Sequence, residues 1–295
     1  MYTKSKYRQE GICMEHFVGV DIGGTKMAFC ARGKDGYLEK QIPTGNTFLA
    51  AQVKQELDLF LQSLPFSVDG VGVAIPGLVS QDREVIRCDA IPGIIGMSAE
   101  FLSQGKFPVH FLNDLRCAAL AEAANYPKDY LIAVALAGSG TALGIVDAGH
   151  LLTGRGFAGE LGYTCMATKD DSVFLVDDMS GGNALLRRTG VSLNTFLSRI
   201  RENDPEALEE VRRAGFYFGL ALANVIGIFN PHVLVVGGGM TSYPGYFEAA
   251  LASCKQHALA QSLEGCLITR PKDEKRIVVL GAMEFIRRIQ KGEPI

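Results

Sequence analysis

Short apolar runs bounded by glycine, proline or charged residues recur along the chain, and stretches with helical spacing separate several of them. Their length and composition predict strands, which we expect at residues 16–20, 27–31, 70–74, 109–112, 130–136, 143–146, 233–236 and 277–279. Helices are expected at 48–64, 115–122 and 206–229. Strands alternating with helices indicate an α/β fold. Because 295 residues exceed what one core usually holds, we expect two domains with a cleft between them.

A glycine-rich turn follows the first expected strand, where an apolar run passes through Asp21 into paired glycines. Gly23 and Gly24 allow main-chain N–H groups to approach an anion, and Thr25 and Lys26 add a hydroxyl donor and a positive charge. Asp21, at the strand end, is suited to hold a hydrated Mg²⁺ beside phosphate groups. The pattern predicts a phosphate-binding turn, with an ordinary Asp/Gly hairpin turn as the alternative.

Two more glycine clusters follow expected strands in the second half of the chain. Residues 138–140, Gly-Ser-Gly, come after the strand at 130–136, so the two halves of the chain begin alike. Residues 237–239 are three consecutive glycines, which leave room for a flat ligand, although a plain strand-to-helix connection explains one or two of them. Duplicated halves facing each other across a cleft would bring such turns to one nucleotide.

Asn113 and Asp114 lie where the strand at 109–112 passes into the helix at 115–122. Either residue is a good N-cap, and this is the simplest interpretation. The functional interpretation is that the helix N-terminus keeps Asp114 ionised, so that it accepts a proton from a substrate hydroxyl during phosphoryl transfer. The two interpretations are compatible.

Charge and composition point away from several classes of protein. The formal net charge is −3, and no basic cluster with interleaved aromatic residues is present, which argues against a nucleic-acid partner. No apolar run approaches the roughly 20 residues of a membrane helix. Residues 1–14 lack the apolar core of a secretory signal, and we expect either a disordered leader or a translation start at Met14. Seven cysteines without a C-x-x-C pair, and five histidines without metal-ligand spacing, favour a cytoplasmic protein free of disulfides.

Six motifs, taken in order, resemble those of the ROK family of sugar kinases, which have the actin/hexokinase-like ATPase fold. They are Asp21–Lys26, Ile75–Leu78, Asn113–Asp114, Gly138–Gly140, Ala158–Gly162 and Asn230–Gly239. The resemblance extends from about His16 to Ile289. It implies two RNase H-like α/β domains with an interdomain cleft, at residues 15–113 and 114–280, the first completed by a C-terminal helix at 281–292. It also implies a homodimer.

The resemblance further implies ATP and Mg²⁺ as cofactors and assigns roles to the motif residues. Residues implied to bind the phosphates, Mg²⁺ through water, or the adenosine are Asp21, Gly23, Gly24, Thr25, Lys26, Gly138, Ser139, Gly140, Gly237, Gly238 and Gly239. Residues implied to contact the sugar are Gly77, Asn113, Asp114, Glu160 and Tyr163. Asp114 would be the catalytic base.

The chain departs from the family pattern after Gly162. Most members carry a histidine there and a C-x-C-G-x-x-G-C-x-E zinc motif, whereas this chain has Tyr163 and a single cysteine, Cys165, in the segment. We therefore predict no structural zinc. The family's glutamate and asparagine contacts to the sugar align with Val176 and Ala90.

Asp89, Asp177 or Asp178 could replace these contacts if the alignment slips by one residue; an exposed acidic cluster is the alternative. Zinc-free relatives occur among kinases that resemble the N-acetylmannosamine and β-glucoside types. Loss of polar contacts would favour a sugar with an apolar or bulky substituent, because unpaired buried hydroxyls are costly.

The sequence thus predicts transfer of the ATP γ-phosphoryl group to a hydroxyl of a hexose or hexose derivative, with N-acetylmannosamine, glucose-type sugars and β-glucosides as candidates. The alternative is a catalytically weak sugar-binding sensor without a DNA-binding domain. Retention of both Asp21 and Asp114 favours the enzyme, because binding alone needs no base. A DNA-binding repressor is disfavoured, since only about 17 residues precede the first expected strand.

Overall fold

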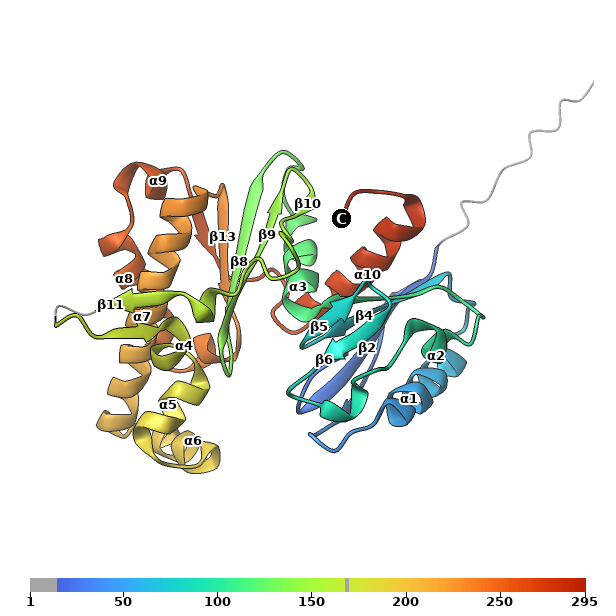
Figure 1. Ribbon diagram of the computed structural model, residues 1–295, viewed down its shortest axis with the longest axis horizontal. Helices are drawn as coiled ribbons and strands as arrows, with labels where there is room; N and C mark the ends of the chain where they lie inside the picture. Colours follow the sequence, from blue (N-terminus) through green and yellow to red (C-terminus); the bar gives the residue numbers. More distant parts are fainter. Residues whose placement is uncertain (1–14, 168–169) are drawn as a thin grey trace, which may run out of the picture.

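Two five-stranded sheets with the same strand order form the framework of the computed structural model, which describes residues 15–167 and 170–295 (Figure 1). In each sheet the first three strands along the chain are antiparallel neighbours. The fourth strand pairs in parallel with the first, and the fifth pairs in parallel with the fourth. The expected leader at 1–14 lies outside the described residues. The predicted α/β fold is confirmed, and the two halves share one topology.

The first sheet has the order β3-β2-β1-β4-β7. Its strands are β1 (Phe17–Ile22), β2 (Lys26–Gly33), β3 (Gly36–Pro43), β4 (Gly70–Ile75) and β7 (Val109–Asn113). One face packs against α1 (Ala50–Ser63) and α2 (Ala99–Ser103). A hairpin of β5 (Leu78–Ser80) and β6 (Glu84–Arg87) follows β4, and a 3₁₀ turn, η1 (Pro92–Ile94), precedes α2. This sheet and its helices form the first lobe.

The second sheet has the order β10-β9-β8-β13-β14. Its strands are β8 (Leu131–Ala137), β9 (Thr141–Asp147), β10 (His150–Leu151), β13 (Val233–Gly237) and β14 (Leu267–Thr269). Alternate residues of β8 and β13 are buried on opposite faces, as expected for strands covered on both sides. One face packs against α7 (Pro205–Phe229), which in turn contacts α8 (Tyr246–His257). This sheet and its helices form the second lobe.

The remaining elements of the second lobe surround these two helices. They are η2 (Leu161–Tyr163), the hairpin β11 (Cys165–Ala167) and β12 (Val173–Leu175), α4 (Val176–Met179), α5 (Gly182–Thr189), α6 (Leu193–Arg201), η3 (Gly239–Ser242) and α9 (Ala260–Glu264). The six cysteines that the structure describes are all free. Among the described helices, none combines the length and apolar character needed to cross a bilayer.

Two helices, α3 (Asp114–Ala123) and α10 (Ile277–Lys291), pack against each other between the two sheets (Figure 1). Their core includes Cys117 of α3 and Phe285 of α10, together with Leu112 of the first sheet and Val134 of the second. At Gly72 of β4, a Cβ atom would lie 1.9 Å from the carbonyl oxygen of Ala282, so only glycine allows α10 to lie this close to the sheet. The two lobes therefore share one layer of helices.

The strand expected at 277–279 is wrong, because these residues form the first turn of α10. The β-branched run Ile277-Val278-Val279 favours a strand by local propensity. In the structure, however, Ile277, Gly281 and Phe285 repeat at helical spacing and are buried between the lobes, and this tertiary packing decides the conformation. The helix expected at 281–292 thus begins four residues earlier. The expected boundary between the two domains, after residue 113, remains a prediction.

Candidate functional site

The carboxyl ends of β1 and β7 bring Asp21 and Asn113 to one edge of the first sheet. Both strands run parallel to β4, with Asp21 opposite Ala74 and Asn113 opposite Ile75. In parallel sheets, groups at this edge lie close together and form ligand sites. Burial and the charge of Asp114 raise the pKa of Asp21 from 3.8 to about 7, although Lys26 lowers it.

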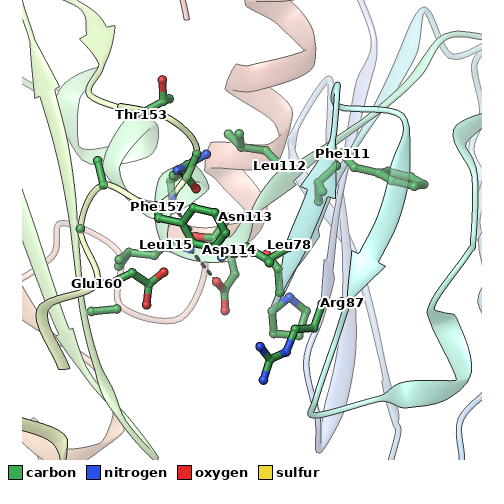
Figure 2. A pocket seen from close by; sticks show the side chains of 18 of the residues that line it. Leu78, Arg87, Phe111, Leu112, Asn113, Asp114, Leu115, Thr153, Phe157 and Glu160 are labelled. Carbon is green, nitrogen blue, oxygen red and sulfur yellow. Dashed lines mark hydrogen bonds between the residues drawn. The ribbon is translucent and has the colours of Figure 1, made fainter. Parts of the chain in front are cut away.

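A cavity of about 850 Å³ lies beside this edge and is lined from both lobes (Figure 2). Pro76 and Gly77 after β4, the β5–β6 hairpin and β7 line it on one side, and the segment 153–163 lines it on the other. All five residues expected to contact a sugar line this one cavity: Gly77, Asn113, Asp114, Glu160 and Tyr163. Their roles remain predictions, but the structure brings them together.

Asn113 is the N-cap of α3, as the simplest interpretation predicted. Its Oδ1 accepts hydrogen bonds from the N–H groups of Leu115 (3.1 Å) and Arg116 (3.3 Å). Its Nδ2 donates to the carbonyl oxygen of Gly77 at 3.3 Å. An amide nitrogen carries two hydrogens, so one remains for a ligand. Asn113 thus caps the helix and presents a donor at the cavity.

Asp114 occupies the first position of α3, and its Oδ1 accepts a hydrogen bond from the Leu115 N–H at 2.8 Å. Burial raises the pKa of Asp114 from 3.8 to about 6, while the backbone N–H groups of Leu115 and Asp114 lower it and Glu160 raises it. A pKa of about 6 leaves Asp114 ionised at neutral pH, and the part that the helix N-terminus plays in this stays a prediction. The two backbone N–H groups stabilise the charge, but desolvation outweighs them.

Glu160 and Tyr163 come from the second lobe at the two ends of η2, and both side chains are exposed. Figure 2 shows Glu160 on the side of the second sheet and Arg87 on the side of the first. Arg87 donates to Asp89 from Nε (2.9 Å) and Nη2 (2.8 Å), and both residues line the cavity. Asp89 is therefore the one candidate replacement for the missing sugar contacts that lies in this cavity.

The other two candidate replacements are engaged elsewhere. Asp177 Oδ1 accepts hydrogen bonds from the backbone N–H (2.6 Å) and the hydroxyl (2.7 Å) of Thr141. Asp178 accepts from the N–H of Leu175 and pairs with Arg187. Neither lines the cavity, so the expectation that they might contact the sugar is not supported by their positions.

Two of the three glycine turns meet at the carboxyl ends of β8 and β13. Gly238 lies against the backbone of Ala137, where a Cβ atom would be 2.4 Å from the carbonyl oxygen. The start of α5 is bonded to the turn at 138–140: the N–H of Gly182 donates to Gly138 O at 2.9 Å, and that of Asn183 to Ser139 O at 3.0 Å. A Cβ atom at Gly239 would meet nothing within 4 Å, so its backbone is open to a ligand.

The first glycine turn connects β1 to β2 in the other lobe. The N–H of Gly23 donates to Lys26 O at 2.9 Å, and the hydroxyl of Thr44 donates to Gly23 O at 2.6 Å. Thr25 and Lys26 are exposed. The structure places this turn beside Ala90 rather than against the other two turns, so convergence of all three on one nucleotide remains a prediction.

Sequence reasoning missed several residues of the cavity, Arg87, Arg116 and Phe157 among them. The repeated glycines at 154, 156 and 159, directly before Glu160, were the signal that could have indicated a shaped loop. Within residues 15–167 and 170–295, no group of three or more histidine, cysteine, aspartate or glutamate side chains could hold a metal ion by itself.

The sequence model of the ROK family matches residues 17–289 of the chain. The glucokinase of Halalkalibacterium halodurans is 27% identical over 289 residues, which cover 84% of this chain and 86% of that protein. The N-acetyl-D-glucosamine kinase of Salmonella arizonae is 27% identical over 266 residues, covering 77% and 85%. The crystal structure of the ROK hexokinase from Thermus thermophilus matches with a TM-score of 0.77 at 25% identity and covers 94% of this chain and 100% of that one. The resemblance drawn from six motifs is confirmed: the chain belongs to the ROK family.

Proposed function

We propose that the chain is an ATP-dependent sugar kinase that transfers the γ-phosphoryl group of Mg-ATP to a hydroxyl of a hexose or hexose derivative. One observation carries the proposal: the carboxylate of Asp114 lines a cavity between two lobes with a pKa raised to about 6. Such a base is ionised at neutral pH and still basic enough to take a proton in a transition state. The names of the relatives, a glucokinase and an N-acetyl-D-glucosamine kinase, support the same activity.

In this proposal Asp114 takes the proton that the sugar hydroxyl loses as its oxygen bonds to the γ-phosphorus and the bond from that phosphorus to the leaving ADP oxygen breaks. The oxygen of Asp114 that is not bonded to Leu115 is available for this step. Asn113 orients the sugar through its remaining amide hydrogen, and Glu160 contacts it from the other lobe. ATP bound with Mg²⁺ supplies the phosphoryl group, and the chain contributes mainly positioning and charge stabilisation.

We further propose that the turns at 23–26, 138–140 and 237–239 hold the nucleotide, with Asp21 holding Mg²⁺ through water. Two observations support the fit: the second and third turns are in contact, and the backbone at Gly239 is open. Asp21 lies close enough to Asp114 for their charges to interact, as expected for a metal-binding group next to the reacting hydroxyl.

The charge of the cavity supports a neutral acceptor. Acidic side chains outnumber basic ones along its walls, and the guanidinium of Arg87 is already paired with Asp89. A sugar acid or sugar phosphate would meet repulsion from Asp114 and Glu160. The two named relatives act on sugars with and without an N-acetyl group. Their names therefore do not decide which class of sugar this chain takes, and the residues that line the cavity have to decide it.

The test is coupled ADP release with Mg-ATP across hexoses, N-acetylhexosamines, ketoses and β-glucosides, comparing the wild type with Asp114→Asn. We expect turnover on a subset of sugars, reduced by about 10²- to 10⁴-fold in the variant because general-base catalysis contributes that much. The KM for sugar should change by no more than about threefold, since Asn keeps the shape of the side chain and a hydrogen-bonding oxygen.

Urea unfolding supplies the folding control for Asp114→Asn. Because burial raises the folded-state pKa, the ionised carboxylate costs stability above pH 6, and that cost is absent below pH 4. At pH 8 the free energy of unfolding of the variant should therefore exceed that of the wild type, by on the order of 1 kcal/mol after solvent screening. Undiminished turnover would refute the role of Asp114. If the wild type phosphorylates none of the sugars but sugars raise its thermal stability, the result would favour a sugar-binding sensor.

A further inference from the structure

The loop between β10 and η2 forms one wall of the cavity, with Thr153 and Gly156 through Glu160 lining it. Gly154, Gly156 and Gly159 have φ angles of 54°, 107° and 99°, a region that favours glycine. The N–H groups of Gly156 (2.9 Å) and Ala158 (3.3 Å) both donate to Thr153 O. The loop is therefore a tight turn held by its own backbone.

Arg116 fixes this loop to α3. Its Nη2 donates to the carbonyl oxygen of Gly156 at 2.6 Å. Its backbone N–H donates to Asn113 Oδ1, so one residue joins the loop to the helix start that carries the proposed base. On the far side of the loop, Gly159 O accepts a hydrogen bond from the Leu143 N–H of β9 at 2.8 Å. Phe157 lies between these two anchors.

Phe157 is the large apolar side chain of this loop that lines the cavity, and 60% of it is exposed. Figure 2 shows its ring close to Asn113 and Leu115 in the view, between Glu160 and Leu78. Tyr163, which is 69% exposed, lines the same cavity from the end of η2. Single exposed apolar residues are ordinary on protein surfaces. Two exposed rings from one segment, both lining one cavity, offer apolar area that a ligand would remove from water.

We propose that Phe157 is a specificity-determining residue that packs against an apolar substituent of the acceptor sugar, such as the methyl of an acetamido group. Arg116 is the positioning residue that holds Phe157 there. The inference rests on the proposed function, because it assumes that this cavity binds the sugar. A phenyl ring makes favourable packing contacts with a methyl group, whereas a free hydroxyl placed against it loses hydrogen bonds to water.

The test measures binding rather than turnover. Titration calorimetry compares N-acetyl-D-glucosamine and N-acetyl-D-mannosamine with D-glucose and D-mannose on the full chain. In Phe157→Ala we expect the N-acetyl sugars to bind about three- to tenfold more weakly, the range measured for aromatic contacts. The unmodified hexoses should change less than about twofold. Phe216→Ala is the matched control, because Phe216 is 40% exposed on α7 and does not line this cavity.

Arg116 is tested by rescue. Arg116→Ala should reduce the preference for N-acetyl sugars as Phe157→Ala does, and Arg116→Lys should restore at least part of it, because lysine can still donate to Gly156 O. Combining Arg116→Ala with Phe157→Ala should give no further loss of preference, since both changes act through one ring. If Arg116 had a merely structural role, Arg116→Ala would instead weaken the binding of all four sugars equally.

The outcomes separate this inference from the proposed function. The inference is overturned if wild-type chain binds unmodified hexoses as tightly as N-acetyl sugars, if it binds none of the four, or if Phe157→Ala weakens both classes alike. Sugar phosphate formation, measured separately, decides the kinase activity. A chain that binds N-acetyl sugars through Phe157 but forms no sugar phosphate would support the inference and refute the kinase.

Discussion

Asp114 is subject to two opposing demands. Its place at the start of α3 gives it backbone hydrogen bonds that favour the charged form. Burial between the lobes disfavours that form and has the larger effect, so the pKa is raised. Asp21 experiences the same burial and the additional repulsion of Asp114. A chain selected only for stability would avoid two such carboxylates in one region. Their presence is the residue-level argument for chemistry rather than simple binding.

The pH dependence of turnover follows from these pKa values. Because Asp114 must be ionised to accept a proton, kcat at saturating sugar and Mg-ATP should fall as pH decreases through about 6, approaching tenfold per pH unit. Glu160 raises the pKa of Asp114, so Glu160→Gln should move the midpoint to lower pH even if it weakens sugar binding. The rates should be measured from pH 5 to 8. A flat profile down to pH 5 would contradict the assignment.

At the residue scale, the sequence predicted those site residues whose positions follow from their neighbours along the chain. Asn113 and Asp114 could be placed because a strand end and a helix start adjoin in sequence. Phe157 and Arg116 could not, because their relation depends on a loop meeting a helix 40 residues away. Asp177 was offered only as one possible sugar contact, and its bond to Thr141 could not be foreseen for the same reason, because the two residues are 36 positions apart.

Asp177 also carries an element-scale prediction, because it attaches α4 to the second glycine turn. The backbone N–H and the hydroxyl of Thr141 both donate to Asp177 Oδ1, and Thr141 is 6% exposed. Removing the carboxylate leaves a buried N–H unpaired and loosens residues 138–140. Asp177→Ala should therefore lower stability by about 1–3 kcal/mol and raise the KM for ATP about tenfold, with little change in the KM for sugar.

Two variants make this prediction sharper. Asp177→Asn keeps an oxygen acceptor and should recover most of the KM for ATP. Asp178→Ala is the matched control, because Asp178 is exposed and contacts Leu175 and Arg187 instead. Urea unfolding and steady-state kinetics give the two readouts. An increase confined to the KM for sugar would instead return Asp177 to the list of sugar contacts.

The elements themselves were predictable where pattern and packing agree. Most strands of the two sheets are short apolar runs that the sequence indicates, whereas the largely exposed β3 and the short β10 and β14 were not expected. The start of α10 is a different case: a β-branched run looks like a strand locally, yet its side chains are needed on one helical face between two lobes. Local propensity is worth only a few tenths of a kcal/mol per residue and yields to such burial.

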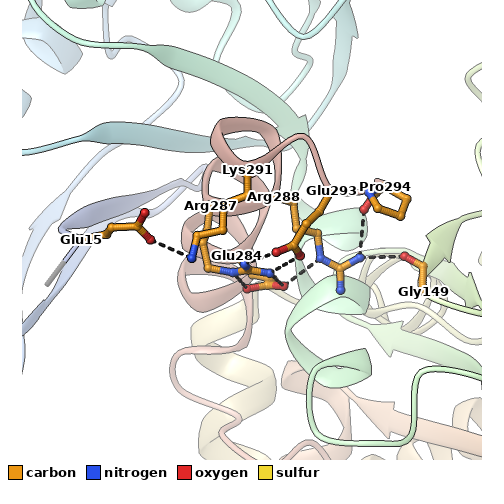
Figure 3. Close-up of polar contacts among 8 residues, drawn as sticks. All are labelled: Glu15, Gly149, Glu284, Arg287, Arg288, Lys291, Glu293 and Pro294. Atoms are coloured by element: carbon orange, nitrogen blue, oxygen red, sulfur yellow. Dashed lines mark hydrogen bonds and ion pairs between the residues drawn. The ribbon is translucent and has the colours of Figure 1, made fainter. Parts of the chain in front are cut away.

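At the scale of the whole molecule, α10 is attached to both lobes. It packs on β1 and β4 through its buried face, and its C-terminal half carries most of the polar network of Figure 3. Arg288 donates from Nε to Glu284 at 2.7 Å and from Nη1 to Gly149 O at 2.7 Å. Gly149 lies in the turn between β9 and β10 of the second sheet. Arg288, which is only 9% exposed, therefore links α10 directly to the second lobe.

Loss of this link should weaken the joint between the lobes. Arg288→Ala leaves Gly149 O without its donor and removes one of the two arginines that hold Glu284 ionised, so we expect a loss of about 2–3 kcal/mol in the free energy of unfolding. Arg212→Ala is the control, because its pair with Glu209 on α7 is exposed and should contribute less than about 1 kcal/mol.

Urea unfolding followed by far-ultraviolet circular dichroism measures both variants. If the shared layer of α3 and α10 couples the lobes, Arg288→Ala should lower the midpoint and broaden the transition, because the lobes then unfold less cooperatively. Arg212→Ala should leave the width unchanged. Equal, small shifts in the two variants would mean that apolar packing around Phe285 and Leu112 alone joins the lobes, and that the Arg288 contact contributes nothing to their coupling.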